Sequence, residues 1–224
     1  MEAIDARRQA GLPRAADRLA TYLRGGVPAG GRRPNPGARD PRPPRHSIGV
    51  ELPGSVYFAG HSTQWRGGVA FYDHETPGPA VGRAYLVTAQ QFADIAAQEM
   101  YRVPDPDDPI EEIVLGGLDP DLGGRHHVGP GHYETLVEVG RIAGAPMLTF
   151  TAPHGIDHVE HIAPSEAYLA MRNQMNADVP TGELELDVTV HDPGVSEDLR
   201  ERSSAARTRC RRRARARGCA PPER

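Results

Sequence analysis

The segment between residues 25 and 45 limits most strongly what this chain can fold into. It reads GGVPAGGRRPNPGARDPRPPR and holds a large share of the 25 glycines and 22 prolines in the 224-residue chain. Proline removes a backbone donor and glycine adds chain entropy, so this stretch is typical of neither a helix nor a strand. We expect a loose, divergent N-terminal segment over residues 1–45 and one folded domain over residues 46–177.

The C-terminal part of the chain divides into two further segments. Residues 183–190 read ELELDVTV, and this strict alternation predicts either an edge strand or a linker within residues 178–197. Residues 198–224 contain ten arginines against three acidic residues and are expected to be a disordered tail. An arginine-rich tail attracts anions, but this one has no aromatic residue to stack on a base, so nucleic-acid binding is disfavoured.

Cysteine content and hydropathy indicate the cellular compartment. The only two cysteines, Cys210 and Cys219, lie in the tail, so the domain has no disulfide framework, which suits a reducing compartment. The first residues, MEAIDARRQAGL, contain no apolar signal region, and no apolar run reaches the length of a membrane span. We therefore expect a cytoplasmic protein without a membrane partner.

Short segments rich in Val, Phe and Tyr, separated by Gly and Pro, predict strands. The segment 133–139 alternates between two faces, and a turn at Gly144 is expected to join it to the next strand as a hairpin. One well-marked helix lies between the strands, which predicts an α+β fold. The expected strands cover residues 50–59, 68–73, 83–88, 133–139 and 147–151.

The expected helix over residues 88–101 contains the most informative position of the domain. Thr88 and Gln91 have the spacing of a capping box, in which each side chain satisfies a backbone N–H of the first turn. The apolar stripe that begins at Phe92 has Glu99 at its position i+7. A glutamate at a core position is either a candidate for general acid–base catalysis or part of a frayed last turn, and periodicity alone leaves both interpretations open.

Several motifs in order resemble the gamma-glutamylcyclotransferase family. The sequence QWRGGVA at residues 64–70 is similar to the Trp-x-Gly-Gly-(Ile/Val)-Ala strand of that family. The strand at residues 133–139 and the sequence PSEAY at residues 164–168 resemble a later strand and the opening of the last helix of the family. The spacing places Glu99 on the catalytic glutamate of the family, and the likeness covers residues 46–177.

The resemblance implies a small mixed β-barrel or curved sheet with packed helices. It also implies an intramolecular reaction, in which the α-amine of a gamma-glutamyl group attacks its own side-chain carbonyl, forms 5-oxoproline and releases an amine or peptide. Glu99 would be the catalytic residue, and no cofactor and no metal would be required. The partner would be a small gamma-glutamyl substrate, and the residues that would bind it are Tyr133, Tyr168, Gly67 and Gly68.

The start of the chain departs from the family. The opening Tyr-Gly-Ser-Asn-Leu of the family, whose loop backbone holds the substrate, has no counterpart in residues 1–15. Impaired activity, or an inactive ligand-binding remnant, is therefore an alternative. A further alternative is a metal-dependent amide hydrolase or deacetylase, because the sequence HGIDHVEH brings His154, His158 and His161 together with spacings typical of a metal-binding cluster.

Overall fold

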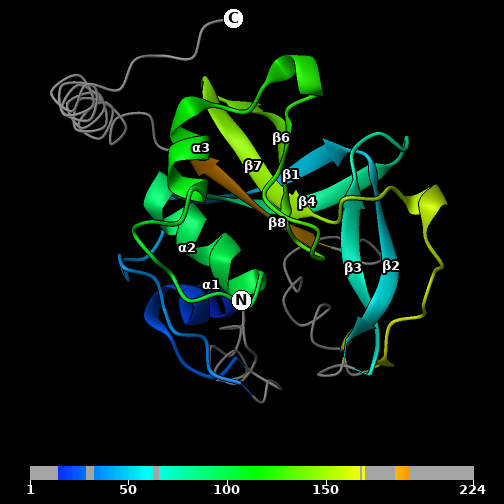
Figure 1. The fold of residues 1–224 in the computed structure, drawn as a ribbon, viewed down its shortest axis with the longest axis horizontal. Coiled ribbons are helices and arrows are strands. Elements are labelled where there is room, and N and C mark those ends of the chain that lie inside the picture. Colours follow the sequence, from blue (N-terminus) through cyan, green and yellow to red (C-terminus); the bar gives the residue numbers. More distant parts are fainter. Residues whose placement is uncertain (1–14, 29–32, 63–65, 167, 170–184, 192–224) are drawn as a thin grey trace, which may run out of the picture.

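The structure is a computed structural model that describes residues 15–28, 33–62, 66–166, 168–169 and 185–191 (Figure 1). The expectations for residues 1–14, 178–184 and 192–224, which include the Arg-rich tail, therefore lie outside the described residues. In the described part of the chain, no helix has both the length and the apolar character needed to cross a membrane.

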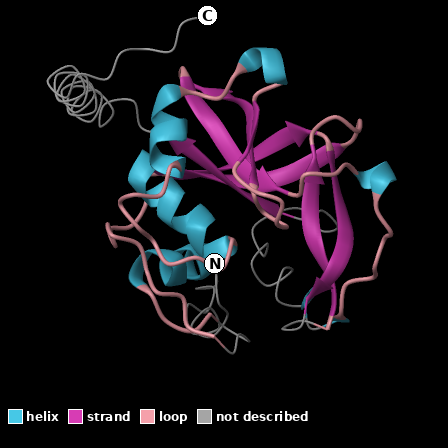
Figure 2. Cartoon of the chain, in the orientation of Figure 1, coloured by secondary structure: helices cyan, strands magenta, loops and turns pink. Residues whose placement is uncertain are grey.

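The chain is a mixed α+β structure, as the sequence predicts (Figure 2). The helices are α1 (Ala15–Arg24), α2 (Ala89–Glu99), α3 (Ile110–Gly116) and the short 3-10 helices η1 (Pro120–Leu122) and η2 (Ile156–His158). The strands are β1 (Ser47–Pro53), β2 (Ser55–Ser62), β3 (Gly67–Asp73), β4 (Pro79–Val87), β5 (Arg125–His127), β6 (Thr135–Ile142), β7 (Ala145–Thr151) and β8 (Glu185–His191).

The described strands form two sheets and no closed barrel. The larger sheet has six strands in the order β1-β4-β8-β7-β6-β5, and the smaller sheet pairs β2 with β3. All neighbouring pairs are antiparallel except β4 and β8, which run parallel. Because β1 and β5 are the two ends of this order, the described strands make an open sheet, so of the two expected forms, a barrel or a curved sheet, the barrel is corrected.

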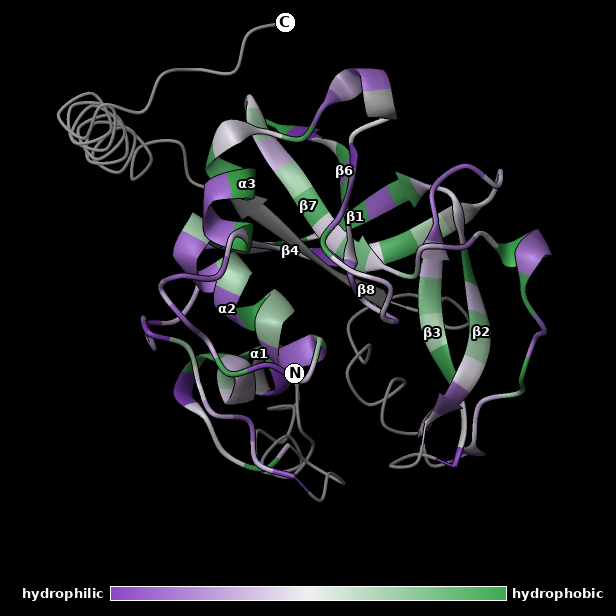
Figure 3. Ribbon diagram, viewed as in Figure 1, coloured by the Kyte–Doolittle hydropathy of each residue, from purple (hydrophilic) through white to green (hydrophobic). Residues whose placement is uncertain are grey.

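Alternation along the strands produces three layers. Tyr85 of β4 and Leu148 of β7 pack against α2 on one face of the large sheet, in a core that α1 also joins. Their sequence neighbours Ala84 and Met147 point to the other face and pack against Tyr72 of β3. The large sheet therefore lies between the helices and the β2–β3 ribbon (Figure 1), and apolar residues follow β3, β4 and β7 (Figure 3).

Helix α2 begins as the sequence predicts. The hydroxyl of Thr88 accepts a hydrogen bond from the backbone N–H of Gln91, and the Gln91 side chain accepts one from the backbone N–H of Thr88, both at 3.1 Å. The capping box is confirmed. Unlike an ordinary surface helix, α2 is buried on its polar side as well, where Asp94 and Gln98 are enclosed.

The hairpin between β6 and β7 is also confirmed. Ile142 pairs with Ala145, so Ala143 and Gly144 form a two-residue turn. Both turn residues have positive φ, 49° at Ala143 and 86° at Gly144. Positive φ at both central positions is the geometry that matches the twist of the flanking strands, and glycine adopts it without steric cost.

The described part of the Gly/Pro-rich segment packs on the domain instead of forming a loose linker. The carboxylate of Asp94 accepts hydrogen bonds from the backbone N–H and the guanidinium of Arg39, and Gln98 accepts one from the backbone N–H of Gly37. The Gln91 amide donates to the backbone carbonyls of residues 40 and 42. One polar face of α2 therefore supplies the partners that the backbone of residues 33–45 cannot obtain from a sheet.

The C-terminal strand is an internal strand, which corrects the expectation of an edge strand or linker. In β8, residues 185–191 pair in parallel with Val81–Val87 of β4. Residues 189 and 190 pair antiparallel with Leu148 and Met147 of β7. An alternating pattern is typical of a strand with one exposed face, but it does not indicate how many neighbours the strand has.

Candidate functional site

Glu99 is the last residue of α2, and its carboxylate is held by two side chains from α1. The guanidinium Nη2 of Arg18 donates to Oε1 of Glu99 at 2.8 Å, and the hydroxyl of Tyr22 donates to the same oxygen. The side chain of Glu99 is only 14 % exposed. The carboxylate is therefore neither frayed into solvent nor paired with Arg102, which instead binds Asp108.

The sequence of α1 explains why it delivers these two partners. Arg18 and Tyr22 are four residues apart and so lie on one face of the helix, where the guanidinium stands 5.7 Å from the centre of the Tyr22 ring. Leu19 and Leu23, one position further along, are buried in the core against the large sheet. The apolar pair fixes the rotation of α1, and the polar pair consequently faces the end of α2.

Two consecutive residues at the end of α2 bind Tyr22, one at its backbone carbonyl and the other at its hydroxyl. Gln98 Nε2 donates to the backbone carbonyl of Tyr22 at 3.0 Å, while Glu99 accepts from the Tyr22 hydroxyl. Gln98 is itself anchored, because its side-chain oxygen accepts from the backbone N–H of Gly37 at 3.2 Å. Helix α1, the Gly/Pro-rich segment and the end of α2 are thereby joined around the carboxylate.

The electrostatics of this cluster keep Tyr22 as a hydrogen-bond donor. Burial raises the pKa of the Tyr22 hydroxyl far above its usual range, and the negative charge of Glu99 raises it further. Tyr22 therefore stays protonated at neutral pH. Both described donors reach Oε1, and none reaches Oε2 of Glu99. A carboxylate with one oxygen fixed, and the other without a donor from the described residues, can accept a proton from a bound molecule.

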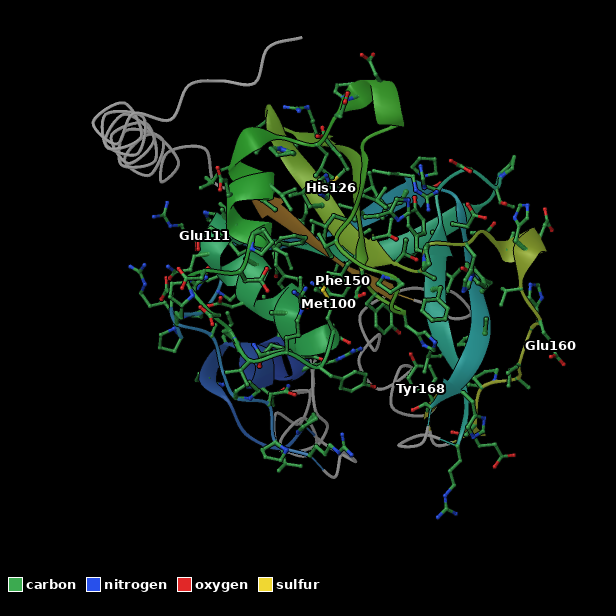
Figure 4. The ribbon with its side chains drawn as sticks, in the orientation of Figure 1. Met100, Glu111, His126, Phe150, Glu160 and Tyr168 are labelled. Atoms are coloured by element: carbon green, nitrogen blue, oxygen red, sulfur yellow. The ribbon has the colours of Figure 1, made fainter. Side chains whose placement is uncertain are left out.

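Tyr133 and Tyr168 both bind the backbone of Ala70 in β3. The Tyr133 hydroxyl donates to the carbonyl of Ala70 at 3.0 Å, and the Tyr168 hydroxyl accepts from the N–H of Ala70 at 3.4 Å. Tyr168 lies beside the β2–β3 ribbon, while Met100 at the end of α2 lies near Phe150 (Figure 4). The described hydrogen bonds give both tyrosines a role in holding β3.

The lack of side chains at Gly67 and Gly68 allows another segment of the chain, residues 162–165, to cross over them. A side-chain carbon at Gly67 would lie 2.7 Å from the backbone nitrogen of Ser165, and one at Gly68 would overlap the carbonyl of Ile162. The backbone N–H of Gly68 also donates to the carbonyl of Ala163 at 3.0 Å. The pair therefore lets the segment before Ser165 pass directly over β3, which is a close approach that only glycine permits.

Two of the three histidines of the alternative metal site, His154 and His161, contact protein groups through their rings. His154 contacts the Tyr57 hydroxyl through Nδ1 at 3.1 Å, and Tyr57 donates to the His154 carbonyl at 2.7 Å. His161 Nε2 lies 2.8 Å from the carbonyl of Ile156. Burial lowers the pKa of His154, and the nearby His132 lowers it further. Across the described residues, no group of three or more His, Cys, Asp or Glu side chains is arranged to hold a metal ion.

A cavity of about 280 Å³ opens at the other end of α2. Its walls come from the segment before β1, from the end of β4 and from the first turn of α2, including Arg42, Arg45 and Gln91. Gln91 precedes Glu99 by eight residues, which is about 12 Å along a helix. Glu99 does not line this cavity.

Sequence reasoning identified Glu99 but not the side chains that hold it. Arg18 and Tyr22 lie 81 and 77 positions away in sequence. The i,i+4 spacing of an arginine and a tyrosine beside two core leucines was the available signal. No protein-family model, no curated protein and no solved structure matches this chain. The geometry of the Glu99 cluster and the sequence motifs are therefore the basis for assigning a function.

Proposed function

We propose that this chain is a gamma-glutamylcyclotransferase-like enzyme in which Glu99 moves the proton that accompanies cyclisation. The observation that carries the proposal is the asymmetry of the carboxylate: Arg18 and Tyr22 bind Oε1, and Oε2 has no donor in the described part of the chain. The resemblance of residues 46–177 to the family supplies the reaction. The lack of cysteine before Cys210 supports a reducing compartment, and we place the enzyme in the cytoplasm.

The proposed reaction needs one proton carrier. Oε2 of Glu99 takes a proton from the substrate α-ammonium group, and the free amine attacks the γ-carbonyl carbon to give a tetrahedral intermediate. The carboxyl group then returns the proton to the leaving nitrogen as the C–N bond breaks, and the carboxylate that results carries the second hydrogen of the ring nitrogen to the released amine. The amine departs as an ammonium ion, the ring becomes 5-oxoproline, and Glu99 is again ionised. Because both reacting groups belong to one molecule, alignment alone can supply up to about 7–11 kcal/mol of the barrier reduction.

Arg18 and Tyr22 act on Glu99 and are positioning residues in this proposal. Their two hydrogen bonds to Oε1 fix the rotation of the carboxylate plane, so Oε2 always presents the same lone pairs. The guanidinium also balances the negative charge in a position that is largely shielded from water. Tyr133, Tyr168, Gly67 and Gly68 belong to the proposed site only through the family resemblance. The hydrogen bonds described for the two tyrosines are to the backbone of Ala70, and the two glycines lie at the chain crossing over β3.

The identity of the product distinguishes the proposed reaction from its alternatives. Purified protein is incubated with L-glutamine, γ-glutamylanilide and γ-glutamyl dipeptides, and the products are separated by liquid chromatography with mass detection. Cyclisation yields 5-oxoproline, and a metal-dependent amidase yields glutamate in a reaction that added zinc stimulates. Glutamate as the sole product would overturn the proposal in favour of the hydrolase. Binding of a γ-glutamyl compound without turnover would favour the ligand-binding remnant.

A further inference from the structure

One polar face of helix α2 binds a single segment of the chain at three successive points. We call this segment, residues 37–42, the strap. Each contact is a hydrogen bond between a side chain of α2 and the backbone of the strap: Gln98 with Gly37 at 3.2 Å, Asp94 with Arg39 at 2.7 Å and Gln91 with Arg42 at 2.9 Å. Positions 91, 94 and 98 lie on one face of a helix. The strap therefore runs antiparallel along α2 and begins at the end where Glu99 is located.

The strap and Gln98 also bind the end of α1. The last four carbonyls of a helix have no donor within the helix. Of these carbonyls in α1, that of Leu23 accepts from the backbone N–H of Ala38 at 3.0 Å, and that of Tyr22 accepts from Nε2 of Gln98 at 3.0 Å. The position of α1 is consequently set by these polar contacts in addition to its apolar face.

Gln98 is the residue at which α1, α2 and the strap meet. The residue is 7 % exposed, and its amide nitrogen donates to the carbonyls of Tyr22 and Asp94, both at 3.0 Å. Its amide oxygen accepts from the backbone N–H of Gly37. Both amide hydrogens and the oxygen are thus bound, which holds a buried amide in one orientation. Gln98 therefore fixes the backbone of Tyr22 relative to the last turn of α2.

A fixed Tyr22 backbone determines where the Tyr22 hydroxyl lies. This hydroxyl donates to Oε1 of Glu99, and Glu99 directly follows Gln98 in the chain. The contacts form a closed ring that passes from the Gln98 amide through the Tyr22 carbonyl and hydroxyl to Glu99 and back along the backbone. Helix ends fray readily, and this ring lies at the last turn of α2. Loss of the Gln98 amide would therefore release the carboxylate as well as the tyrosine.

We propose that Gln98 is a positioning residue for Glu99, and that the strap holds Gln98 in the orientation that this role requires. The inference rests on the proposed proton transfer at Glu99 and concerns a residue that acts only through Tyr22. A small displacement of a catalytic group slows the chemical step strongly. Removal of the Gln98 amide should therefore lower kcat and leave KM nearly unchanged, since substrate binding is not its role.

The kinetic test compares the same substitution at two glutamines of α2. Both glutamines are buried and bind the strap, but Gln98 binds Tyr22 and Gln91 binds the first turn of α2. Methionine has a similar length and lacks the amide. For Gln98→Met we expect kcat for 5-oxoproline release to fall about tenfold and KM to change less than about twofold. Gln91→Met should lower the melting temperature by breaking the capping box and leave kcat within about twofold of wild type. Equal losses of kcat in both variants would overturn the proposal.

The Tyr22 ring gives a second readout that does not require turnover. The protein is labelled with tyrosine that carries carbon-13 at the hydroxyl-bearing Cζ, and the Tyr22 signal is the one that Tyr22→Phe lacks. This signal should move in Gln98→Met and stay in place in Gln91→Met. A folded Gln98→Met protein with a wild-type kcat, or with an unmoved Tyr22 signal, would overturn the proposal. If Gln98→Met does not fold, the same two measurements are made on Gln98→Asn, whose amide is one methylene shorter.

Failure of the proposed function is distinguishable from failure of this inference. If wild-type protein releases no 5-oxoproline from any γ-glutamyl compound, the proposed function fails, and the Tyr22 signal alone decides the positioning. A signal that moves in Gln98→Met but not in Gln91→Met would retain the chain of contacts from Gln98 to Glu99. A signal that moves in neither variant would refute it.

Discussion

The hydroxyl of Tyr22 donates a hydrogen bond to Oε1 of Glu99, and these two residues of different helices lie 77 positions apart. The adjacent Gln98 binds the carbonyl of the same tyrosine. The contact therefore joins α1 to α2 at the candidate catalytic carboxylate, and the described donors bind Oε1 and not Oε2.

Replacement of Tyr22 by phenylalanine tests whether this contact positions Glu99. The variant keeps the ring beside Arg18 and removes only the hydroxyl, so we expect a loss of about 1–2 kcal/mol in the free energy of unfolding. We also expect kcat for 5-oxoproline release to fall about tenfold, because the carboxylate can rotate. The decisive comparison is a double-mutant cycle: in a Glu99→Gln background, Tyr22→Phe should have no further effect on kcat. Additive losses would show that Tyr22 acts independently of Glu99.

The buried carboxylate of Asp94 should hold the Gly/Pro-rich segment on the domain. Asp94 is 1 % exposed and binds both the backbone and the guanidinium of Arg39. We expect Asp94→Ala to lower the free energy of unfolding by about 1.5–3 kcal/mol, as for hydrogen bonds to a charged group. Amide hydrogen exchange at Gly37 and Arg39 should accelerate in this variant. The control variant is Asp157→Ala, which replaces an exposed aspartate. Fast exchange at the amides of Gly37 and Arg39 in the wild-type protein would contradict the packing described.

A methyl group added at Gly68 should destabilise the folded state far more than one added at Gly49. The added carbon at Gly68 would overlap the carbonyl of Ile162, whereas nothing lies within 4 Å of a carbon added at Gly49. We expect Gly68→Ala to lower the free energy of unfolding by about 1–3 kcal/mol or more. Gly49→Ala should leave it unchanged or raise it by up to about 1 kcal/mol. Urea unfolding of both variants measures the difference. Equal stabilities would show that the chain segment at residues 162–165 does not cross β3.

Asp73 should make stability depend on pH in the acidic range. Burial acts to raise the pKa of its carboxyl, but hydrogen bonds from Ile156, Glu75 and Thr76 outweigh burial and hold the pKa below its usual value. The folded state then binds this proton less well than the unfolded state, so the stabilisation is complete above about pH 4 and is lost as pH falls further. The stability difference between wild type and Asp73→Asn should therefore shrink as pH falls below about pH 4. A difference that is constant over this range would contradict the role of Asp73.

Local patterns in the sequence predicted the elements but not their partners. The capping box at Thr88 and the turn at Gly144 depend on neighbouring residues, so spacing alone was sufficient to find them. The stripe from Phe92 correctly gave one buried face of α2. The opposite face is buried as well, because Asp94 and Gln98 bind a segment that composition described as a linker, and composition says nothing about which side chains will satisfy its backbone.

The candidate site shows the same division between local and long-range information. Glu99 stood out because a charged residue occupied a core position, which is a local anomaly. Arg18 was missed because its partner lies 81 positions away, and the sequence does not state which helices will meet. The place of β8 between β4 and β7 was missed for the same reason, since strand order depends on contacts across the whole chain.

The most direct test of the proposed function is the rate of 5-oxoproline release by Glu99→Gln beside the matched variant Glu160→Gln. Glutamine preserves the shape of the side chain and removes its ability to carry the proton. Glu160 is exposed at the outer edge of the molecule, far from α2 (Figure 4), so its replacement is a control for the loss of one negative charge. We predict a decrease of about 10²–10⁴-fold for Glu99→Gln and a wild-type rate for Glu160→Gln, with both proteins folded. A folded Glu99→Gln protein that releases 5-oxoproline at the wild-type rate would contradict the proposal.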